Sequence, residues 1–377
     1  MTLSPAERAR YHRHLILEEI GVAGQEKLKA ARILVIGAGG LGSPAALYLV
    51  AAGVGTVGIV DCDQVEASNL QRQVLFDTSD VGRPKAEAAR ERLESLNPQI
   101  AVVAHALELR AANVRSVLGA YDLILDGTDR PSTRYLVNDA CVILGKPLVV
   151  AAIHRNEGHA MTYVPGRGPC YRCLFADAAD GVVPNCAQAG VLGVLPGVLG
   201  AIQATEAIKV ILGVGEPLIG RLLTYDALEM RFHEFAFERR HDCAVCGDRP
   251  TITEPREPLE ACAVAALDRV QRLSAAALRT LLDPATRDGA LVLIDVREPC
   301  EFDAGHLAGA INIPVTALQD RLQEIPPRTS PVFICRSGGR SLAACAIALR
   351  AGTVSPAHLE GGLLAWRAEV DPTLAVV

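Results

Sequence analysis

The chain has 377 residues, of which 50% are hydrophobic and 21% are charged. Its length suggests about two or three domains, and its composition excludes a disordered or fibrous protein. The formal net charge of −6 argues against binding nucleic acid through a broad basic surface.

The longest nearly apolar run, Ala189–Ile202, is shorter than the roughly 20 residues that cross a bilayer. Segment 1–13 is polar and has no signal-peptide core. We therefore expect a cytoplasmic protein that binds neither membranes nor nucleic acid.

Short β-rich apolar runs alternate with helical segments in the first part of the chain. The predicted strands are Ile33–Gly37, Val57–Asp61, Ala101–His105, Asp122–Asp126 and Pro147–Ala152. The predicted helices are Leu41–Ala52, Pro84–Leu96 and Pro131–Leu144. Alternation at this spacing indicates a parallel sheet that is covered by helices on both faces.

A second α/β pattern follows a proline-rich segment. Residues 249–258 hold three prolines and no apolar period, which indicates a linker, and we place it at 248–272. Beyond it, strands are predicted at Leu291–Asp295 and Pro331–Cys335, and a helix at Ser341–Arg350. The sequence therefore predicts an α/β fold in two domains, residues 1–247 and 273–377.

The glycines after the first predicted strand, Gly37-Ala-Gly39-Gly40-Leu-Gly42, fit the pattern G-x-G-x-x-G. Such a loop lets phosphate approach the backbone at a helix N-terminus, and Asp61 stands where a ribose-binding carboxylate is expected. Alone, this pattern indicates a nucleotide, most often in a nicotinamide-dependent dehydrogenase, or a glycine turn without a ligand. Asn69, Arg72 and Lys85 follow, and they offer more cationic and polar groups than a dinucleotide pyrophosphate needs. This cluster favours a triphosphate.

The strings V-I-G-A-G-G-L-G-S-P, D-C-D-Q-V-E-A-S-N-L-Q-R-Q and V-G-R-P-K resemble the ubiquitin-activating superfamily. The most similar branch is that of the bacterial adenylyltransferases that activate the sulfur carriers of molybdopterin and thiamine synthesis. The resemblance covers about residues 5–247. It implies a Rossmann-like domain, ATP, Mg²⁺ and a ubiquitin-like sulfur carrier protein that ends in Gly-Gly. The carrier carboxylate would attack the α-phosphate of ATP and give an acyl-adenylate and pyrophosphate.

The resemblance also implies roles for particular residues. The nucleotide contacts would be Gly39 and Gly40 at the phosphates, Asp61 at the ribose, and Asn69, Arg72 and Lys85 around the triphosphate. Asp129, in L-D-G-T-D, would bind Mg²⁺, although Arg130 follows it where the family usually has asparagine. Arg13, in R-Y-H-R, would reach into the ATP site of a partner subunit, which implies a homodimer.

Four of the eleven cysteines form two C-x-x-C pairs, Cys170/Cys173 and Cys243/Cys246. Two such pairs favour a closed tetrahedral thiolate site for structural Zn²⁺, and the superfamily has zinc at these positions. A disulfide or a redox pair is less favoured, because the protein is expected to be cytosolic and neither pair opens a helix after a strand.

Cys186 lies in a polar, turn-rich stretch, V-P-N-C-A-Q-A-G. A lone cysteine is usually a small buried apolar residue. The superfamily has a cysteine in this segment that can join covalently to its carrier, so we expect Cys186 to take part in catalysis.

Cys335 follows a predicted strand and begins the loop C-R-S-G-G-R-S before a helix. Backbone N–H groups, Arg336 and Arg340 would favour an anionic sulfur there. A buried structural cysteine or a phosphatase-type phosphate loop are the alternatives, and the spacing from Cys335 to Arg340 fits the phosphatase loop poorly. Segment 273–372 resembles rhodanese, through D-V-R-E-P, G-A-I-N-I-P and G-G-L-L-A-W among other motifs. The resemblance implies that Cys335 carries a persulfide, while Asp295, Arg297 and His306 shape the fold.

Together the two resemblances predict an adenylyltransferase and sulfurtransferase that converts the carrier's terminal glycine into a thiocarboxylate. The pathway would be synthesis of molybdopterin, thiamine, cysteine or thiolated tRNA. The sulfur donor would be thiosulfate or a cysteine desulfurase persulfide. The alternatives are a nicotinamide-dependent dehydrogenase with an accessory domain, a non-enzymatic carrier-binding scaffold, and an enzyme of protein conjugation.

Overall fold

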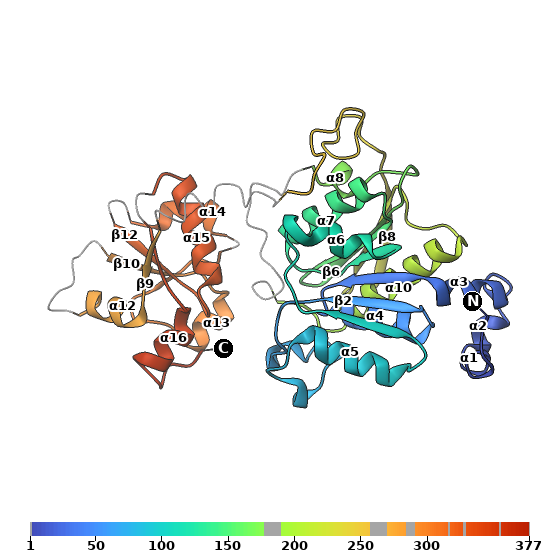
Figure 1. Ribbon diagram of the computed structural model, residues 1–377. Coiled ribbons are helices and arrows are strands. Elements are labelled where there is room, and N and C mark those ends of the chain that lie inside the picture. The colour runs from blue at the N-terminus through green and yellow to red at the C-terminus, as the bar shows by residue number, and fades with distance from the viewer. Residues whose placement is uncertain are drawn as a thin grey trace. The chain divides into compact units, whose positions relative to one another are not determined.

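The computed structural model describes residues 2–176, 190–256, 270–283, 291–315, 317–326, 329–353 and 356–376. The chain divides into two compact units (Figure 1). Of the described residues, the first unit holds 2–176 and 190–256 and the second holds 270–376. The predicted fold class, a Rossmann-like α/β domain followed by a smaller α/β domain, is confirmed.

The described part of the first unit contains an eight-stranded sheet with strand order β3-β2-β1-β4-β5-β6-β7-β8. Its parallel strands are β1 (Arg32–Ile36), β2 (Thr56–Val60), β3 (Ala101–His105), β4 (Leu123–Asp126) and β5 (Leu148–His154). Three antiparallel strands extend the sheet beyond β5: β6 (Glu157–Tyr163), β7 (Arg221–Asp226) and β8 (Arg231–Ala236). The predicted parallel sheet is present in β1 to β5, and the antiparallel strands β6 to β8 lie beyond the strands that the sequence predicts. Strand β8 has no apolar pattern that would predict it, because every one of its residues is exposed.

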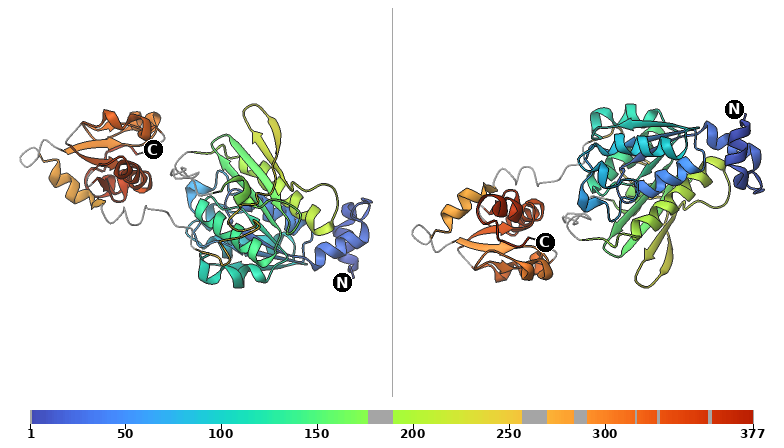
Figure 2. Two further views of the ribbon diagram at one scale, coloured as in Figure 1. Left: turned by 90° about the horizontal axis from the view of Figure 1, so that it is seen from above. Right: turned by 90° about the horizontal axis from the view of Figure 1, so that it is seen from below.

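Helices cover both faces of this sheet (Figures 1 and 2). One face carries α3 (Gly21–Ala30), α4 (Gly42–Ala51), α5 (Lys85–Leu96) and α10 (Leu195–Leu212). The other carries α6 (Ala111–Gly119), α7 (Pro131–Leu144) and α8 (Tyr171–Leu174). Strand β1 supplies both cores, because Ile33 and Val35 join one apolar cluster while Leu34 and Ile36 join the other.

Several short elements complete the first unit. They are α1 (Pro5–Arg10), α2 (His12–Leu15) and the 3-10 turns η1 (Ala67–Asn69) and η2 (Thr78–Asp80). Within the described residues, α10 is the one helix whose length and hydropathy would let it cross a membrane, and half of it is buried in the unit. It packs on α4 and β5, so its apolar residues contribute to a protein core.

The described part of the second unit contains a parallel five-stranded sheet with order β11-β10-β12-β13-β9. Its strands are β9 (Gln271–Leu273), β10 (Leu291–Asp295), β11 (Ile311–Asn312), β12 (Ser330–Ile334) and β13 (Ala357–Leu359). Strand β9 pairs with β13, so the predicted linker, 248–272, extends too far by the first residues of β9.

The helices of the second unit also lie on two faces. Helices α14 (Leu318–Arg321) and α15 (Gly339–Arg350) contribute to one apolar cluster, and α12 (Ala275–Leu281) and α16 (Gly362–Glu369) to the other. The remaining helical segments are α13 (Pro299–Ala304) and η3 (Leu322–Glu324).

Candidate functional sites

The nucleotide-type loop joins β1 to α4 at the carboxyl edge of the sheet. The chain leaves β1 toward β2 and β3 on one side and returns to β4 on the other, so this edge lies at a topological switch point. In open α/β sheets, ligands bind in the crevice at such a point. The segments that follow β1, β2 and β4 meet there, because these three strands are neighbours.

The glycines of this loop have different reasons to be glycine. Gly37 has φ +87°, and a Cβ on Gly42 would lie 1.7 Å from the carbonyl oxygen of Gly37, so the turn itself requires both. A Cβ on Gly40 would lie 3.1 Å from Pro196, a tight contact. At Gly39 the nearest atom would be 3.7 Å away, in the Gln73 side chain, and its φ is not positive. The fold therefore does not require glycine at 39, which fits close approach of a ligand.

Asp61 holds this loop from the end of β2. Its Oδ2 accepts the backbone N–H of Ala38 at 2.8 Å, and its Oδ1 accepts the N–H of Asp63 at 2.9 Å. Burial raises the pKa of Asp61, although Lys85 and both N–H donors oppose the shift. A carboxylate has about four acceptor sites, so Asp61 keeps capacity for ribose hydroxyls.

Lys85 begins α5 and is buried beside the same loop. Its Nζ lies 3.3 Å from Asp63, and Arg130 lies 3.7 Å from the other oxygen of that carboxylate. Asp63 was not predicted as a site residue. The signal was its place two residues beyond the strand end, next to Asp61. With Asp63 half exposed, the Lys85 ammonium can exchange this partner for a phosphate.

Asn69 lies at the end of η1 and is buried, and Arg72 follows η1 and lies beside Gly40 of the glycine loop. The Arg72 Cγ would lie 3.5 Å from a Cβ on Gly40, and its guanidinium donates to the Ser68 carbonyl at 3.2 Å. The neighbouring Gln73 is buried, and its Oε1 has no hydrogen-bond partner within the described residues. Gln73 is a second polar residue at this loop that was not predicted as part of the site.

Asp129 is exposed on the loop after β4 and forms no hydrogen bond or ion pair in the described part of the chain. A buried set of groups holds that loop. Asp126 accepts Nε of Arg134 at 2.9 Å and both the N–H and the hydroxyl of Thr128 at 2.9 and 2.8 Å. Arg134 also donates to the Thr128 carbonyl at 2.6 Å, and Gln203 of α10 donates to the Asp126 carbonyl at 2.7 Å. A free carboxylate on a fixed loop fits a hard cation such as Mg²⁺.

Arg13 lies at the opposite edge of the sheet from these groups. Its neighbour Tyr11 accepts a hydrogen bond from Asn97, which precedes β3, and packs against Gly53, which precedes β2. Helices α1 and α2 therefore lie at the amino ends of the strands (Figure 1). Arg13, in α2, is exposed. The nucleotide-type loop of the same chain lies at the carboxyl ends.

The two C-x-x-C pairs come together into one cluster, and no other set of potential metal ligands was found in the described residues. All four sulfur atoms lie within 4.8 Å of one another, with Cys170–Cys243 at 3.7 Å and Cys173–Cys246 at 3.3 Å. Tetrahedral zinc with bonds of about 2.3 Å needs sulfurs about 3.8 Å apart, so the cluster fits Zn²⁺. The Arg240 N–H points to Cys173 Sγ at 3.4 Å, as an outer-shell donor does.

Cys335 lies at the end of β12, buried beneath the loop that leads into α15. The Gly338 N–H donates to its Sγ at 3.1 Å. The first turn of α16 donates to the Cys335 carbonyl through the Leu363 N–H at 2.8 Å. Gly362 must be glycine, since its φ is +62° and a Cβ would lie 2.4 Å from the Cys335 carbonyl oxygen.

The two loop arginines differ in their surroundings, and Arg340 interacts electrostatically with Cys335. Arg340 forms a two-pronged ion pair with Glu301 of α13, at 2.5 and 2.7 Å, so its charge is largely matched. Arg336 is exposed. Asp295 and Arg297 form a fully buried ion pair at 2.9 Å, which agrees with a role in the fold.

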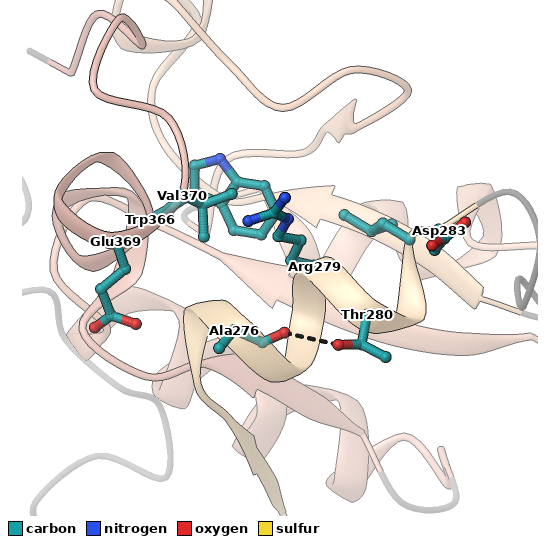
Figure 3. Close-up of a pocket in the computed structure, with 8 residues that line it drawn as sticks. Ala276, Arg279, Thr280, Asp283, Trp366, Glu369 and Val370 are labelled. Atoms are coloured by element: carbon teal, nitrogen blue, oxygen red, sulfur yellow. Dashed lines mark hydrogen bonds between the residues drawn. The ribbon is translucent and has the colours of Figure 1, made fainter.

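Cys186 lies outside the described residues, so its role stays a prediction. A pocket with a volume of about 590 Å³ lies between α12 and α16, lined partly by Arg279, Trp366 and Val370 (Figure 3). None of its lining residues belongs to the Cys335 loop.

Comparison with known proteins matches both units. The ThiF family model matches residues 11–245, and the rhodanese-like domain model matches 275–369. The chain is 45% identical to a probable adenylyltransferase/sulfurtransferase MoeZ of Mycobacterium tuberculosis, over 99% of this chain and 96% of that protein. It is 40% identical to the adenylyltransferase and sulfurtransferase MOCS3 of Aedes aegypti, over 99% and 90%. A sulfur carrier protein adenylyltransferase of Thermus thermophilus is 53% identical over 67% of this chain and 96% of its own length.

Solved structures resemble the first unit. E. coli MccB in complex with ATP superposes with a TM-score of 0.54 at 28% identity, covering 59% of this chain and 69% of that one. MccB with a MccA peptide variant gives a TM-score of 0.57 at 28% identity, covering 63% and 75%.

Proposed function

Because the chain belongs to the ThiF family and carries a rhodanese-like domain, we propose that it adenylates a ubiquitin-like sulfur carrier protein and then delivers sulfur to it. Relatives that match nearly the whole chain carry both activities in their names. One observation supports the coupling of both steps above all: a nucleotide-type loop and a sulfur-type cysteine loop occur in the two units of one chain. We therefore favour an adenylyltransferase and sulfurtransferase over a dehydrogenase or a non-enzymatic scaffold.

The first step is adenylation at the carboxyl edge of the first sheet. The phosphates of ATP would lie against Gly39 and Gly40, with Lys85 and Arg72 beside them and Asp61 at the ribose. The cations offset the charge of pyrophosphate as it leaves, and the fixed loops hold the carrier carboxylate in line with the α-phosphate. Asn69 would orient the triphosphate.

Two metal ions fit the first unit. Asp129 would hold Mg²⁺, which supplies further neutralisation of phosphate charge when bound. The four cysteines of the cluster would hold Zn²⁺ with no open position, so the role of this ion is structural. Arg13 would complete the active site of a partner subunit in a homodimer, because it lies far from the site edge of its own chain.

The second step transfers sulfur from a Cys335 persulfide. Its terminal sulfur attacks the acyl-adenylate carbonyl, the carbon–oxygen bond to AMP breaks, and the carrier becomes joined to Cys335 through an acyl disulfide. A second thiol then reduces this S–S bond, which releases the thiocarboxylate and leaves Cys335 in a disulfide with that thiol. Cys186, which belongs to the adenylating part of the chain, is the candidate residue for a covalent bond to the carrier.

The sulfur donor would be thiosulfate or the persulfide of a cysteine desulfurase. The product would supply sulfur to molybdopterin, thiamine, cysteine or tRNA thiolation in the cytoplasm. No role in binding nucleic acid or membranes is proposed.

The experiment is ATP–pyrophosphate exchange with candidate carriers that end in Gly-Gly, added one at a time. We expect exchange that depends on one carrier, is lost in Asp129→Ala and survives in Cys335→Ala. Formation of the thiocarboxylate, followed by mass spectrometry of the carrier, should be lost in both variants. Zinc-loaded, folded protein that shows no exchange with any carrier would reject the adenylation step.

A further inference from the structure

Two buried polar residues lie behind the Cys335 sulfur and have no role in the function above. Ser341, in α15, is fully buried, and its Oγ lies 3.5 Å from Cys335 Sγ. The same hydroxyl lies 2.9 Å from the Gly338 carbonyl and 3.3 Å from Nδ1 of His358. His358 comes from β13 and is 5% exposed. The Cys335 sulfur, the Ser341 hydroxyl and the His358 imidazole thus form a continuous hydrogen-bonded chain.

The protons in this hydrogen-bonded chain can be counted. A serine hydroxyl has one proton to donate and two lone pairs. With that proton directed to the Gly338 carbonyl, the Cys335 thiol and His358 Nδ1–H are both donors to Ser341 Oγ. This assigns the Nδ1–H tautomer to His358 from the network.

The other nitrogen of His358 supports this assignment. Nε2 is buried and has no hydrogen-bond partner within the described residues. Burial lowers the pKa of His358, and Arg272 of β9 adds to this while Glu360 opposes it, so the ring is neutral near pH 7. If this position served packing alone, an apolar ring would suit it better, because it would leave no buried nitrogen without a hydrogen bond. The contact of Nδ1 with Ser341 therefore gives the reason for a histidine here.

We propose that Ser341 and His358 are positioning residues that stabilise the thiolate of Cys335. This inference rests on the proposed function, in which Cys335 accepts and carries sulfur. When the thiol loses its proton to solvent, the Ser341 hydroxyl turns from the Gly338 carbonyl to the sulfur, where the Gly338 N–H already donates. His358 Nδ1–H continues to donate to Ser341 Oγ, so the hydroxyl proton is available to donate to the sulfur.

The thiolate is the form that reaction with a sulfur donor requires. With thiosulfate, the Cys335 thiolate attacks the outer sulfur, a new S–S bond forms at Cys335, and the S–S bond of thiosulfate breaks to release sulfite. Charge and electrons balance without a further oxidant. Among the described residues, Arg340 interacts electrostatically with Cys335 while it is paired with Glu301, and Arg336 of the same loop is exposed.

The test is a pH titration of the ultraviolet thiolate absorbance of the full chain. Each variant is measured against the same variant carrying Cys335→Ser, so that the other cysteines cancel. Loss of one hydrogen bond to an ion should move the Cys335 ionisation midpoint in Ser341→Ala upward by about one pH unit, a roughly tenfold loss of thiolate at fixed pH.

Substitutions of His358 test the tautomer. His358→Phe keeps a ring but no donor, and we expect a smaller upward shift. His358→Asn places an amide nitrogen near the position of Nδ1 and should restore the wild-type midpoint, whereas His358→Gln places it near Nε2 and should not. Thermal unfolding of the second unit checks that each variant is folded.

An unchanged midpoint in folded Ser341→Ala would overturn the proposal. A downward shift in His358→Phe would show that the imidazole draws the hydroxyl proton away from sulfur, and would overturn the role of His358. Neither result depends on sulfur transfer. By contrast, thiocarboxylate formation that persists in Cys335→Ser would reject the proposed function and leave this titration valid.

Discussion

Replacing Arg134 by methionine should test whether the Asp126–Arg134 pair positions the Asp129 loop in addition to stabilising the first unit. The Arg134 side chain is 8% exposed and pairs with the fully buried Asp126 at 2.9 Å. Burial opposes the charge of Arg134, but Asp126 outweighs it, and the pKa of the arginine is raised. The variant leaves an uncompensated buried carboxylate, which costs about 3–5 kcal/mol. For a unit of this size that corresponds to a fall of roughly 6–20 °C in Tm.

The matched control is Arg297→Met in the second unit, which breaks an ion pair of the same 2.9 Å length and similar burial. Scanning calorimetry should show each variant lowering the transition of its own unit. ATP–pyrophosphate exchange is then measured well below both transitions. Only Arg134→Met should lose exchange, because only Arg134 fixes the Thr128 carbonyl next to Asp129.

The double variant Asp126→Leu/Arg134→Met sharpens the test. Removing both partners of a buried pair often restores stability. The loop, however, would still lack the two hydrogen bonds that Thr128 donates to Asp126. We therefore expect recovered Tm without recovered exchange. Exchange that follows Tm in all these variants would refute the idea that the pair positions Asp129.

Further predictions concern the glycine loop, the zinc cluster and pH. Gly42→Ala should unfold or severely destabilise the first unit, since its Cβ would lie 1.7 Å from a carbonyl oxygen, whereas Gly39→Ala should keep a wild-type Tm and lose ATP affinity, measured by calorimetry. Chelation of Zn²⁺ should lower the Tm of the first unit alone and release one zinc per chain to a colorimetric dye, because the four sulfurs fit a closed site. Burial alone would raise the pKa of Glu301, but Arg340 outweighs it and lowers the pKa below the ordinary 4.5. This pair therefore stabilises the second unit above about pH 4.5 and is lost as pH falls through the lower folded value, so the Tm of Glu301→Gln should converge with that of wild type in acid.

The sequence was sufficient for features that depend on neighbouring residues. Strands β1, β2 and β4 form apolar runs because they are buried on both faces. The glycine loop and the C-x-x-C pairs are local patterns with fixed spacing, and the fold brings each set together.

What the sequence did not show depends on contacts across the fold. Asp126, Arg134 and Gln203 come from three elements and meet only in the folded unit. The pairing of Arg340 with Glu301 likewise joins residues 39 positions apart, so the sequence does not show that Arg340 shares its charge between Glu301 and the Cys335 site. Strand β8 is not predictable from the sequence, because its exposed polar and apolar residues have no pattern of burial.

The position of Arg13 leads to a prediction about subunits. It lies at the amino ends of the strands while Asp129 follows β4 at the carboxyl ends, so one chain does not bring the two together. If Arg13 serves the site of a partner, then Arg13→Ala and Asp129→Ala should each abolish exchange, and mixed dimers should recover it. Random assortment makes half of the dimers mixed, and each has one intact site of two, so about a quarter of wild-type exchange should return. Differently tagged chains would demonstrate that mixed dimers form. Mixed dimers without activity would place Arg13 in its own chain's site, because every site would then contain one of the two defects.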